Sequence, residues 1–400
     1  MTRRNVYLVL AAAAAIFGLT LGIRTALALF ISAINTQTGL GLVAISFAFA
    51  VSQLTWGISQ PFAGAIADRY GAGRVLGAGI LMVAAGTALT TVAGTTGALV
   101  FTIGVLVAVG AGAAGPSILL SAMQRFLPPE KRGIGAGMVT AGGSFGQLAI
   151  VPMAQGLIGW TGWMGALFWL GGLAAAAVPL AWVLRGKSEA PAAGATPHEP
   201  FGQALRRAFG DSNYMLLNAG FFTCGFHVAF ISTHLPGVVD ACQLPPSVGA
   251  WSLAVIGFGN MIGSFAIGWS MNRWRFKSLL ALVYATRAVA VAVFLVAPKT
   301  ELTFLLFAMV LGVSWLSTVP PTAGLVAKFY GPRYMATLFG VVMLSHQIGG
   351  FLGAYLGGLA FAATGSYDWM WYADIALALG AAVVHLPIRE KPVRPVAVPA

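Results

Sequence analysis

The chain repeats part of its own sequence at an offset of about two hundred residues. The segment GAIADR at 64–69 recurs 204 positions later as GWSMNR at 268–273. Nearer the start of each half, TLGIR at 20–24 matches TCGFH at 223–227. Such a repeat predicts two similar halves related by a pseudo-twofold axis, with a site between them. The second match places Arg24 of one half opposite His227 of the other.

Apolar segments long enough to cross a membrane fill both halves. Hydrophobic residues make up 58% of the chain and charged residues only 8%, which excludes an ordinary soluble domain. A stretch of about 18 or more apolar residues is long enough for a helix to span a bilayer. The predicted spans cover 6–33, 43–65, 75–93, 98–125, 133–159, 162–185, 213–239, 246–271, 278–297, 302–328, 334–363 and 367–387.

The expected fold is an all-α membrane protein with twelve transmembrane helices in two pseudo-twofold-related six-helix bundles. Residues 1–185 are expected to form the N-terminal bundle, and residues 212–400 the C-terminal bundle with a short cytoplasmic tail. Between them, residues 186–211 are rich in Pro, Ala and Gly and then become amphipathic. This composition predicts a cytoplasmic linker that ends in a short surface helix.

The basic residues predict the orientation of the spans. With both termini on the cytoplasmic side, 19 of the 22 Lys and Arg residues also lie on that side, as the positive-inside rule requires. The net charge of +12 therefore belongs to one membrane face and faces anionic headgroups of the lipid bilayer. Nucleic-acid binding is not expected, because the chain offers no solvated basic domain.

The loop GAIADRYGAGR at 64–74, between the second and third predicted spans, resembles the signature loop of the major facilitator superfamily. A degenerate second copy covers residues 268–277. The resemblance implies the major facilitator fold, transport without a cofactor, and a monomer in the bacterial inner membrane. It also implies gating roles for a set of charged residues at the cytoplasmic ends of the helices, Asp68, Arg69, Arg74 and Arg273.

Asp68 has a physical reason to act as a gate. A carboxylate at the cytoplasmic end of a helix can pair with a nearby Arg or with a helix N-terminus, and so hold the two halves together. The alternative is a turn that only ends the second helix.

The segment GFHVAFISTHLP at 225–236 is similar to bacterial relatives of the monocarboxylate and oxalate/formate transporters. Animal monocarboxylate transporters carry an Asp and an Arg on the eighth span, where this chain has Asn260 and Ser264. Proton coupling of the lactate type therefore cannot be carried over from the resemblance.

Arg24 is the principal candidate for substrate binding. It lies near the middle of the first span, where a charge costs several kcal/mol unless it is compensated. The two acidic residues of the first half, Asp68 and Glu130, lie outside its apolar spans. The simplest partner is an anion that enters and leaves, such as a carboxylate bound through two parallel hydrogen bonds. The alternative is an arginine satisfied by backbone carbonyls, polar side chains and water.

His227 is the symmetry mate of Arg24 and is expected to face it across the cavity. An imidazole can donate a hydrogen bond to an anion, or it can take up a proton near neutral pH, which makes His227 a candidate for proton coupling. The alternative is a buried histidine that is only hydrogen-bonded. The full predicted substrate site contains Arg24, His227, Thr20, Thr223, Phe226, Trp315, Asn260, His346 and Gln347.

Arg287 is the other deep charge, in the ninth predicted span. Asp374 in the twelfth span lies at a matching depth, so the two residues are predicted to form a structural ion pair.

These features together predict a secondary transporter for a small, monocarboxylate-like organic anion, which works by alternating access. It is either a proton symporter through His227 or an anion antiporter. The alternative function is a multidrug efflux pump with an apolar cavity. Enzyme activity and a metal site are not expected, because the sequence shows no paired carboxylates, metal-ligand cluster or oriented nucleophile.

Overall fold

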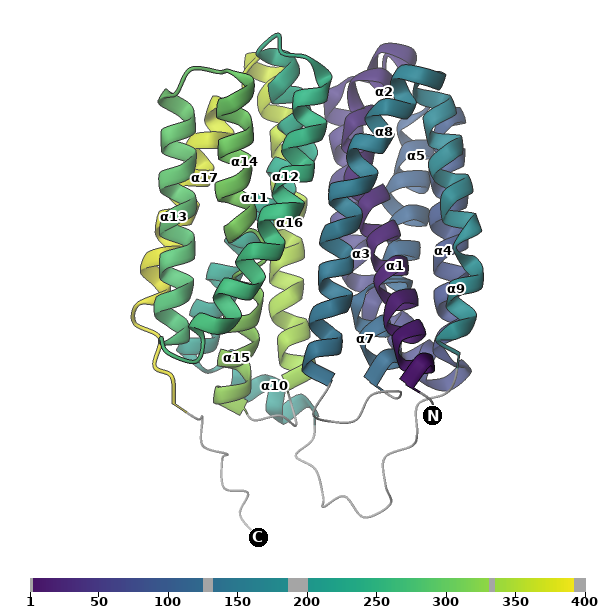
Figure 1. Cartoon of the computed structure of the whole chain (residues 1–400). Helices are drawn as coiled ribbons and strands as arrows, with labels where there is room; N and C mark the ends of the chain where they lie inside the picture. The colour runs from purple at the N-terminus through teal and green to yellow at the C-terminus, as the bar shows by residue number, and fades with distance from the viewer. Residues whose placement is uncertain (1–2, 125–131, 186–200, 331–334, 392–400) are drawn as a thin grey trace.

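A computed structural model describes residues 3–124, 132–185, 201–330 and 335–391. The described secondary structure is helical throughout (Figure 1). The helices run nearly parallel to one axis, and α1 (Arg3–Ala26) begins at the same face at which α17 (Asp368–His385) ends. This face is called the terminal face below, and the opposite one the distal face.

The first half comprises α1 to α9. After α1 the chain continues as η1 (Leu27–Phe30), α2 (Ile31–Thr38), α3 (Leu42–Tyr70), α4 (Ala72–Leu89), η2 (Thr90–Val92), α5 (Thr96–Leu99), the π-helix η3 (Val100–Val107), α6 (Ala108–Ala113), α7 (Pro116–Gln124), α8 (Arg132–Ala176) and α9 (Val178–Val183).

The second half comprises α11 to α17. The short helix α10 (Phe201–Phe209) precedes it and has the length expected for the surface helix at the end of the linker. The helices that follow are α11 (Ser212–Ala241), α12 (Pro246–Ser270), α13 (Phe276–Val296), α14 (Glu301–Ser314), α15 (Val319–Tyr330), α16 (Met335–Thr364) and α17. Of the predicted linker 186–211, residues 186–200 lie outside the described part of the chain.

The helices confirm the twelve predicted spans. Ten helical stretches of the described chain are long and apolar enough to cross a membrane. One of them, Gly137–Val183, contains two spans, because Gly162 with φ of 72° breaks α8 in two. A left-handed φ of this kind suits glycine, which has no Cβ to clash. The remaining span is α17.

The fourth and tenth spans are each interrupted near their middle. In the fourth span the interruption separates α6 from α7, and in the tenth it separates α14 from α15 at residues 315–318. Pro116 follows the first interruption, and Pro320, 204 positions later, follows the second. Because proline lacks an N–H and clashes with the preceding turn, it favours such breaks. Interrupted helices at matching positions of two repeats are typical of transporter binding sites.

Glycines allow two symmetry-related pairs of helices to pack closely. A Cβ built on Gly22 of α1 would lie 2.7 Å from the carbonyl oxygen of Gly146 of α8. In the second half, a Cβ on Gly349 of α16 would overlap the carbonyl oxygen of Phe222 of α11. Gly146 and Gly349 are 203 residues apart, so the repeat preserves the same close contact in both halves.

The two halves contact each other from their middle towards the distal face. Gly57 of α3 lies against Gln347 of α16, and the ring of Phe47 on α3 lies 5.5 Å from that of Tyr355 on α16. On the other side of the interface, Asn260 of α12 donates to Ser144 Oγ of α8 at 2.9 Å.

One apolar cluster contains residues of both halves in this joined region. Nearer the terminal face, the buried apolar residues form two separate clusters, one in each half. The halves are thus joined at the distal end and packed independently at the terminal end.

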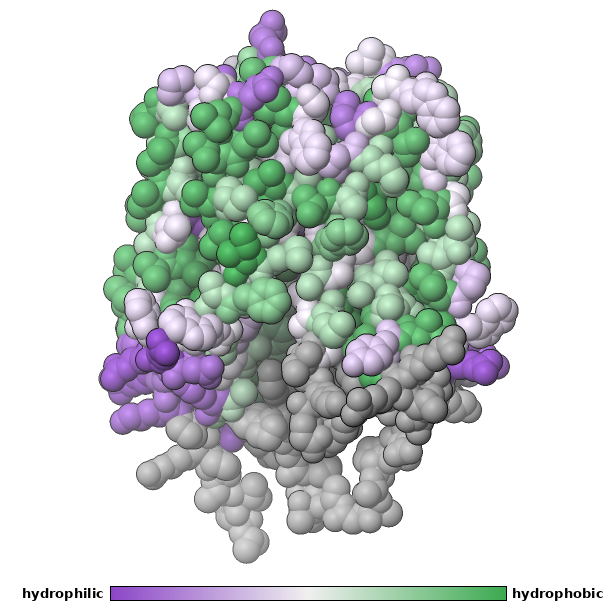
Figure 2. Space-filling model, viewed as in Figure 1, coloured by the Kyte–Doolittle hydropathy of each residue, from purple (hydrophilic) through white to green (hydrophobic). Residues whose placement is uncertain are grey.

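The described surface suits a bilayer. Figure 2 shows hydrophobic residues in a broad band around the middle of the molecule and hydrophilic residues gathered at its two ends. Side chains such as Phe101, Val293 and Leu306 are exposed within that band, because the surrounding lipid removes any need to bury them.

Candidate functional site

Arg24 lies at the end of α1 and extends to α3. Its Nη2 donates to Gln53 Oε1 at 2.5 Å, and its guanidinium carbon lies 4.6 Å from the centre of the Trp56 ring. Such a cation–π contact stabilises the charge without neutralising it. Arg24 Nε is buried and has no hydrogen-bond partner in the described part of the chain. The guanidinium therefore keeps a donor free for a ligand.

Gln347 of α16 is a buried polar residue that packs against α3 from the other half. Its side chain packs on Gly57, one helical turn along α3 from Gln53. Gln53 itself lies against Gly350 of α16. Only 1% of Gln347 is exposed, and neither its Oε1 nor its Nε2 has a partner among the residues that the structure describes. A buried amide in this state loses about 1–3 kcal/mol for each unmade hydrogen bond, so it is suited to a ligand that supplies the missing groups.

His227 of α11 pairs with Asp374 of α17. His227 Nδ1 lies 2.6 Å from Asp374 Oδ2, and both residues are fully buried. His227 Nε2 and Asp374 Oδ1 have no partner. The imidazole ring also lies 6.1 Å from the ring of Trp315. His227 and Arg24 therefore bind partners in different halves and have no common contact among these side chains.

The predicted ion pair between Arg287 and Asp374 is wrong. Arg287 is fully buried but donates from Nη2 to the carbonyl oxygens of Ser314 and, at 2.6 Å, Trp315. Its Nη1 donates to Cys224 Sγ at 3.3 Å. The interruption between α14 and α15 leaves these carbonyls without helical N–H partners, and the guanidinium satisfies them instead. Asp374 is correspondingly free to pair with His227.

The other predicted substrate residues occupy different environments. Asn260 joins the two halves through Ser144 and also accepts a hydrogen bond from the Leu316 N–H at 3.1 Å. Thr20 donates to the carbonyl oxygen of Ile16 in its own helix. Thr223, Phe226 and Trp315 are buried.

His346, next to Gln347, is buried with an unpartnered Nδ1, and its ring lies 5.0 Å from the ring of Phe221. The structure thus places Arg24 against Gln53 and Trp56 of α3, and His227 against Asp374.

The predicted gating residues lie at the terminal face. Arg74 and Arg273 are exposed, and the Arg273 guanidinium lies 4.2 Å from the centre of the Trp269 ring. The side chains of Asp68 and Arg69 lie outside the described part of the chain.

Trp56 contacts Arg24 but is not among the predicted site residues. A sequence signal was available, because Trp56 lies one turn after Gln53 on the second span, and polar groups in the middle of an apolar span are functional candidates. The helix interruptions could also have been found from Pro116 and Pro320.

Several known transporters are similar to the chain. An uncharacterized MFS-type transporter of Bacillus subtilis is 24% identical over 338 residues, covering 81% of this chain and 80% of that protein. Monocarboxylate transporter 13 of Rattus norvegicus is 25% identical, with 84% and 77% covered. The oxalate:formate antiporter of Oxalobacter formigenes is 24% identical, with 87% and 82% covered.

A solved structure supports the same fold. The crystal structure of a bacterial homolog to the human lysosomal transporter Spinster, in an inward-facing and unoccupied conformation, superposes with a TM-score of 0.71 at 18% identity. The match covers 97% of this chain and 95% of that one. The Major Facilitator Superfamily profile matches residues 8–354 and again 243–399. The chain therefore belongs to the Major Facilitator Superfamily and is a multi-pass membrane protein.

Proposed function

We propose that the protein is a secondary active transporter that moves a small organic anion of the monocarboxylate kind by alternating access. The proposal rests on the position and contacts of Arg24. Its two contacts, Gln53 and Trp56, are neutral, and the acidic residues of the first half lie outside its apolar spans. An uncompensated charge at this depth costs several kcal/mol, and a bound carboxylate would offset that cost.

Two relatives support this substrate class. One is named a monocarboxylate transporter and another an oxalate:formate antiporter, and both names describe small carboxylates. In this chain, the free Nε of Arg24 and the unpartnered Nε2 of Gln347 supply donors from opposite halves. A carboxylate bound to both would link the halves and thereby couple occupancy to their relative movement.

The separate apolar clusters near the terminal face favour a state that is open on that side. With both termini in the cytoplasm of a bacterial cell, as the basic residues predict, this is an inward-facing state of an inner-membrane protein. Arg74 and Arg273 then lie at the cytoplasmic ends of the helices, where gating contacts form when the halves close. Asp68 and Arg69 are proposed to act with them.

Proton coupling is assigned to His227 together with Asp374. When the imidazole is protonated, the buried pair is neutral overall. Loss of that proton leaves a single carboxylate charge in the membrane interior, which is costly. Proton release is therefore favoured when water reaches the pair. The free Nε2 of His227 and Oδ1 of Asp374 are the atoms at which water or substrate would exchange the proton.

The test is thermal stabilisation of the purified protein in detergent by a panel of small carboxylates, inorganic oxyanions and cationic drugs. Carboxylates are expected to stabilise the wild type but not Arg24→Gln. Arg24→Lys keeps the charge but loses the planar pair of donors, so it should respond only in part. Arg275→Gln, at an exposed position on the terminal face, is the control and should respond as the wild type does.

A different result would contradict the proposal. If cationic or neutral apolar compounds stabilise the wild type and Arg24→Gln equally, and carboxylates have no effect, the protein is a drug-efflux pump and Arg24 is a structural residue.

A further inference from the structure

We propose that the first half binds an anionic phospholipid in a groove between α4 and α9 at the terminal face. This site is separate from the proposed substrate site at Arg24, and it shares Arg74 with the proposed gating residues. The lipid phosphate is bound by Arg74 and Arg185, and an acyl chain follows the apolar part of the groove.

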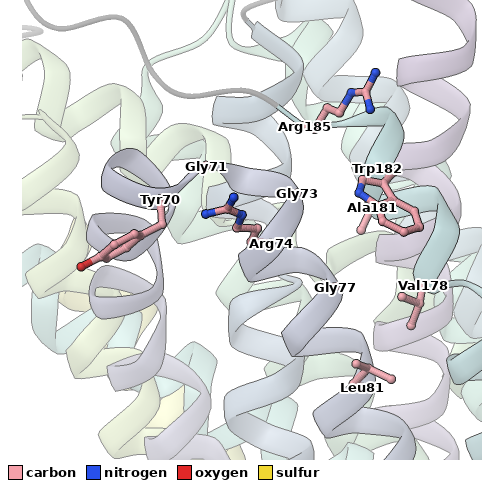
Figure 3. A pocket seen from close by; sticks show the side chains of 10 residues that line it. All are labelled: Tyr70, Gly71, Gly73, Arg74, Gly77, Leu81, Val178, Ala181, Trp182 and Arg185. Atoms are coloured by element: carbon pink, nitrogen blue, oxygen red, sulfur yellow. The ribbon is translucent and has the colours of Figure 1, made fainter.

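The groove has a charged end and an apolar end. It encloses about 630 Å³, and its lining includes Arg74, Gly77, Leu81, Val178, Trp182 and Arg185. Figure 3 shows the two arginines near the end where the chain leaves towards the linker, with Leu81 and Val178 further along the helices. This order matches a phospholipid, which has its charge at one end and its hydrocarbon at the other.

The two arginines line the same groove with no acidic residue in its lining. Gly73 precedes Arg74, and a Cβ built on Gly73 would lie only 3.2 Å from the Cβ of Arg185. Neither guanidinium has a hydrogen bond or ion pair among the residues that the structure describes. Both guanidinium groups therefore keep their hydrogen-bond donors for an anion bound at this end of the groove, and that anion is attracted by both charges.

The matching corner of the second half is occupied by an acid instead. Glu390 Oε2 pairs with Lys328 Nζ at 2.7 Å, and Glu390 Oε1 accepts from the backbone N–H of Lys277 at 2.9 Å. Lys277 Nζ donates to the carbonyl oxygen of Leu386 at 2.6 Å.

Sequence position explains the difference between the two corners. Arg185 corresponds to Arg389 at an offset of 204, so the position of Glu390 corresponds to Gly186 in the first half. The second half thus carries its own anion at this corner, whereas the first half has glycine at that position and needs an external one.

Membrane lipid is the source that fits the whole groove. A free phosphate would use only the charged end and would leave the surface beside Gly77, Leu81 and Val178 without an occupant. Trp182 is 70% exposed at the rim, and tryptophan favours the headgroup level of a bilayer. Each basic side chain at a membrane surface attracts anionic lipids by about 1.7 RT, roughly fivefold in affinity.

The experiment measures lipid retention by native mass spectrometry of the full-length protein in detergent, with phosphatidylglycerol and phosphatidylcholine as probes. The double variant Arg74→Gln/Arg185→Gln is expected to bind phosphatidylglycerol at least about tenfold more weakly than the wild type. The matched control is Arg275→Gln/Arg389→Gln, which removes the same charge from exposed positions of the second half. The control should retain the lipid.

A second variant tests the apolar end of the groove. A Cβ on Gly77 would lie 3.9 Å from the Cβ of Ala181, an ordinary contact distance, so Gly77→Ile fills the groove without disturbing the helices. It should weaken phosphatidylglycerol binding while both arginines remain.

Three results would overturn the proposal. The first is equal loss of phosphatidylglycerol in the double variant and its control, which would indicate nonspecific attraction to the basic face. The second is unchanged binding in both. The third is complete displacement of the lipid by glycerol 3-phosphate at equal concentration with no effect of Gly77→Ile, which would make this a site for a soluble anion.

Discussion

The bond between His227 and Asp374 predicts strong energetic coupling between two helices far apart in sequence. The perturbation is a double-mutant cycle with His227→Gln, Asp374→Asn and the double variant. Nδ1 and Oδ2 lie 2.6 Å apart, and neither residue is exposed. Both singles are expected to be less stable than the wild type.

The magnitude follows from burial and charge. Removing one partner of a buried pair leaves the other uncompensated and costs about 3–5 kcal/mol. The double variant removes both charges, so its cost should fall short of the sum of the singles. A charge-assisted hydrogen bond contributes about 1.5–3 kcal/mol, and the coupling energy should lie in that range.

The assay is the free energy of unfolding from denaturant titration in mixed micelles, with circular dichroism as the probe. A second cycle, with Arg287→Met and Asp374→Asn, is the comparison. Since Arg287 binds the carbonyls of Ser314 and Trp315 and not Asp374, this coupling should stay below about 0.5 kcal/mol. A larger coupling to Arg287 than to His227 would refute the assignment of the pair.

Three further predictions concern packing, topology and coupling. Gly349→Leu should destabilise the protein by about 1–3 kcal/mol or more through overpacking against α11. Gly340→Leu is the control and should not, because a Cβ at Gly340 has no neighbour within 4 Å among the described residues. Equal unfolding free energies of the two variants would contradict the close contact at Gly349. Burial raises the pKa of the Cys242 thiol, so an impermeant maleimide should label Cys242 slowly at pH 7 and faster as rising pH increases the thiolate fraction. Because Cys242 follows α11 at the distal face, the reagent should reach it from outside the cell; labelling from the cytoplasm alone would reverse the proposed orientation. Asp374→Asn should abolish anion accumulation driven by a pH gradient in proteoliposomes but leave anion exchange intact, and undiminished accumulation would remove Asp374 from proton coupling.

Sequence patterns were informative where a property depends on a short stretch of chain. Each apolar stretch of sufficient length formed a helix, because in a membrane the backbone must satisfy its own hydrogen bonds within the segment. The glycines that the repeat preserves, such as Gly146 and Gly349, lie at close helix contacts in both halves. These features need only length, hydrophobicity and side-chain size.

Partners of buried charges were less predictable. Depth along a span suggested Asp374 for Arg287, but adjacent helical residues point about 100° apart, so residues at equal depth can face away from each other. Arg287 instead donates hydrogen bonds to the backbone carbonyls at the interruption of the tenth span. Gln53 became the partner of Arg24 for the same reason, since the rotation of α3 about its axis decides which side chain reaches α1.

Hydrophobicity and repetition alone identify a membrane protein of twelve spans in two related halves, with a cation within the first span. These properties hold before any helices pack. Helix packing, in contrast, brings Arg24 to Gln53 and Trp56, pairs His227 with Asp374 and joins the halves towards the distal face. Those outcomes depend on helix rotation, tilt and interruption, which arise from packing between helices that are 29 residues apart for Arg24 and Gln53 and 147 apart for His227 and Asp374.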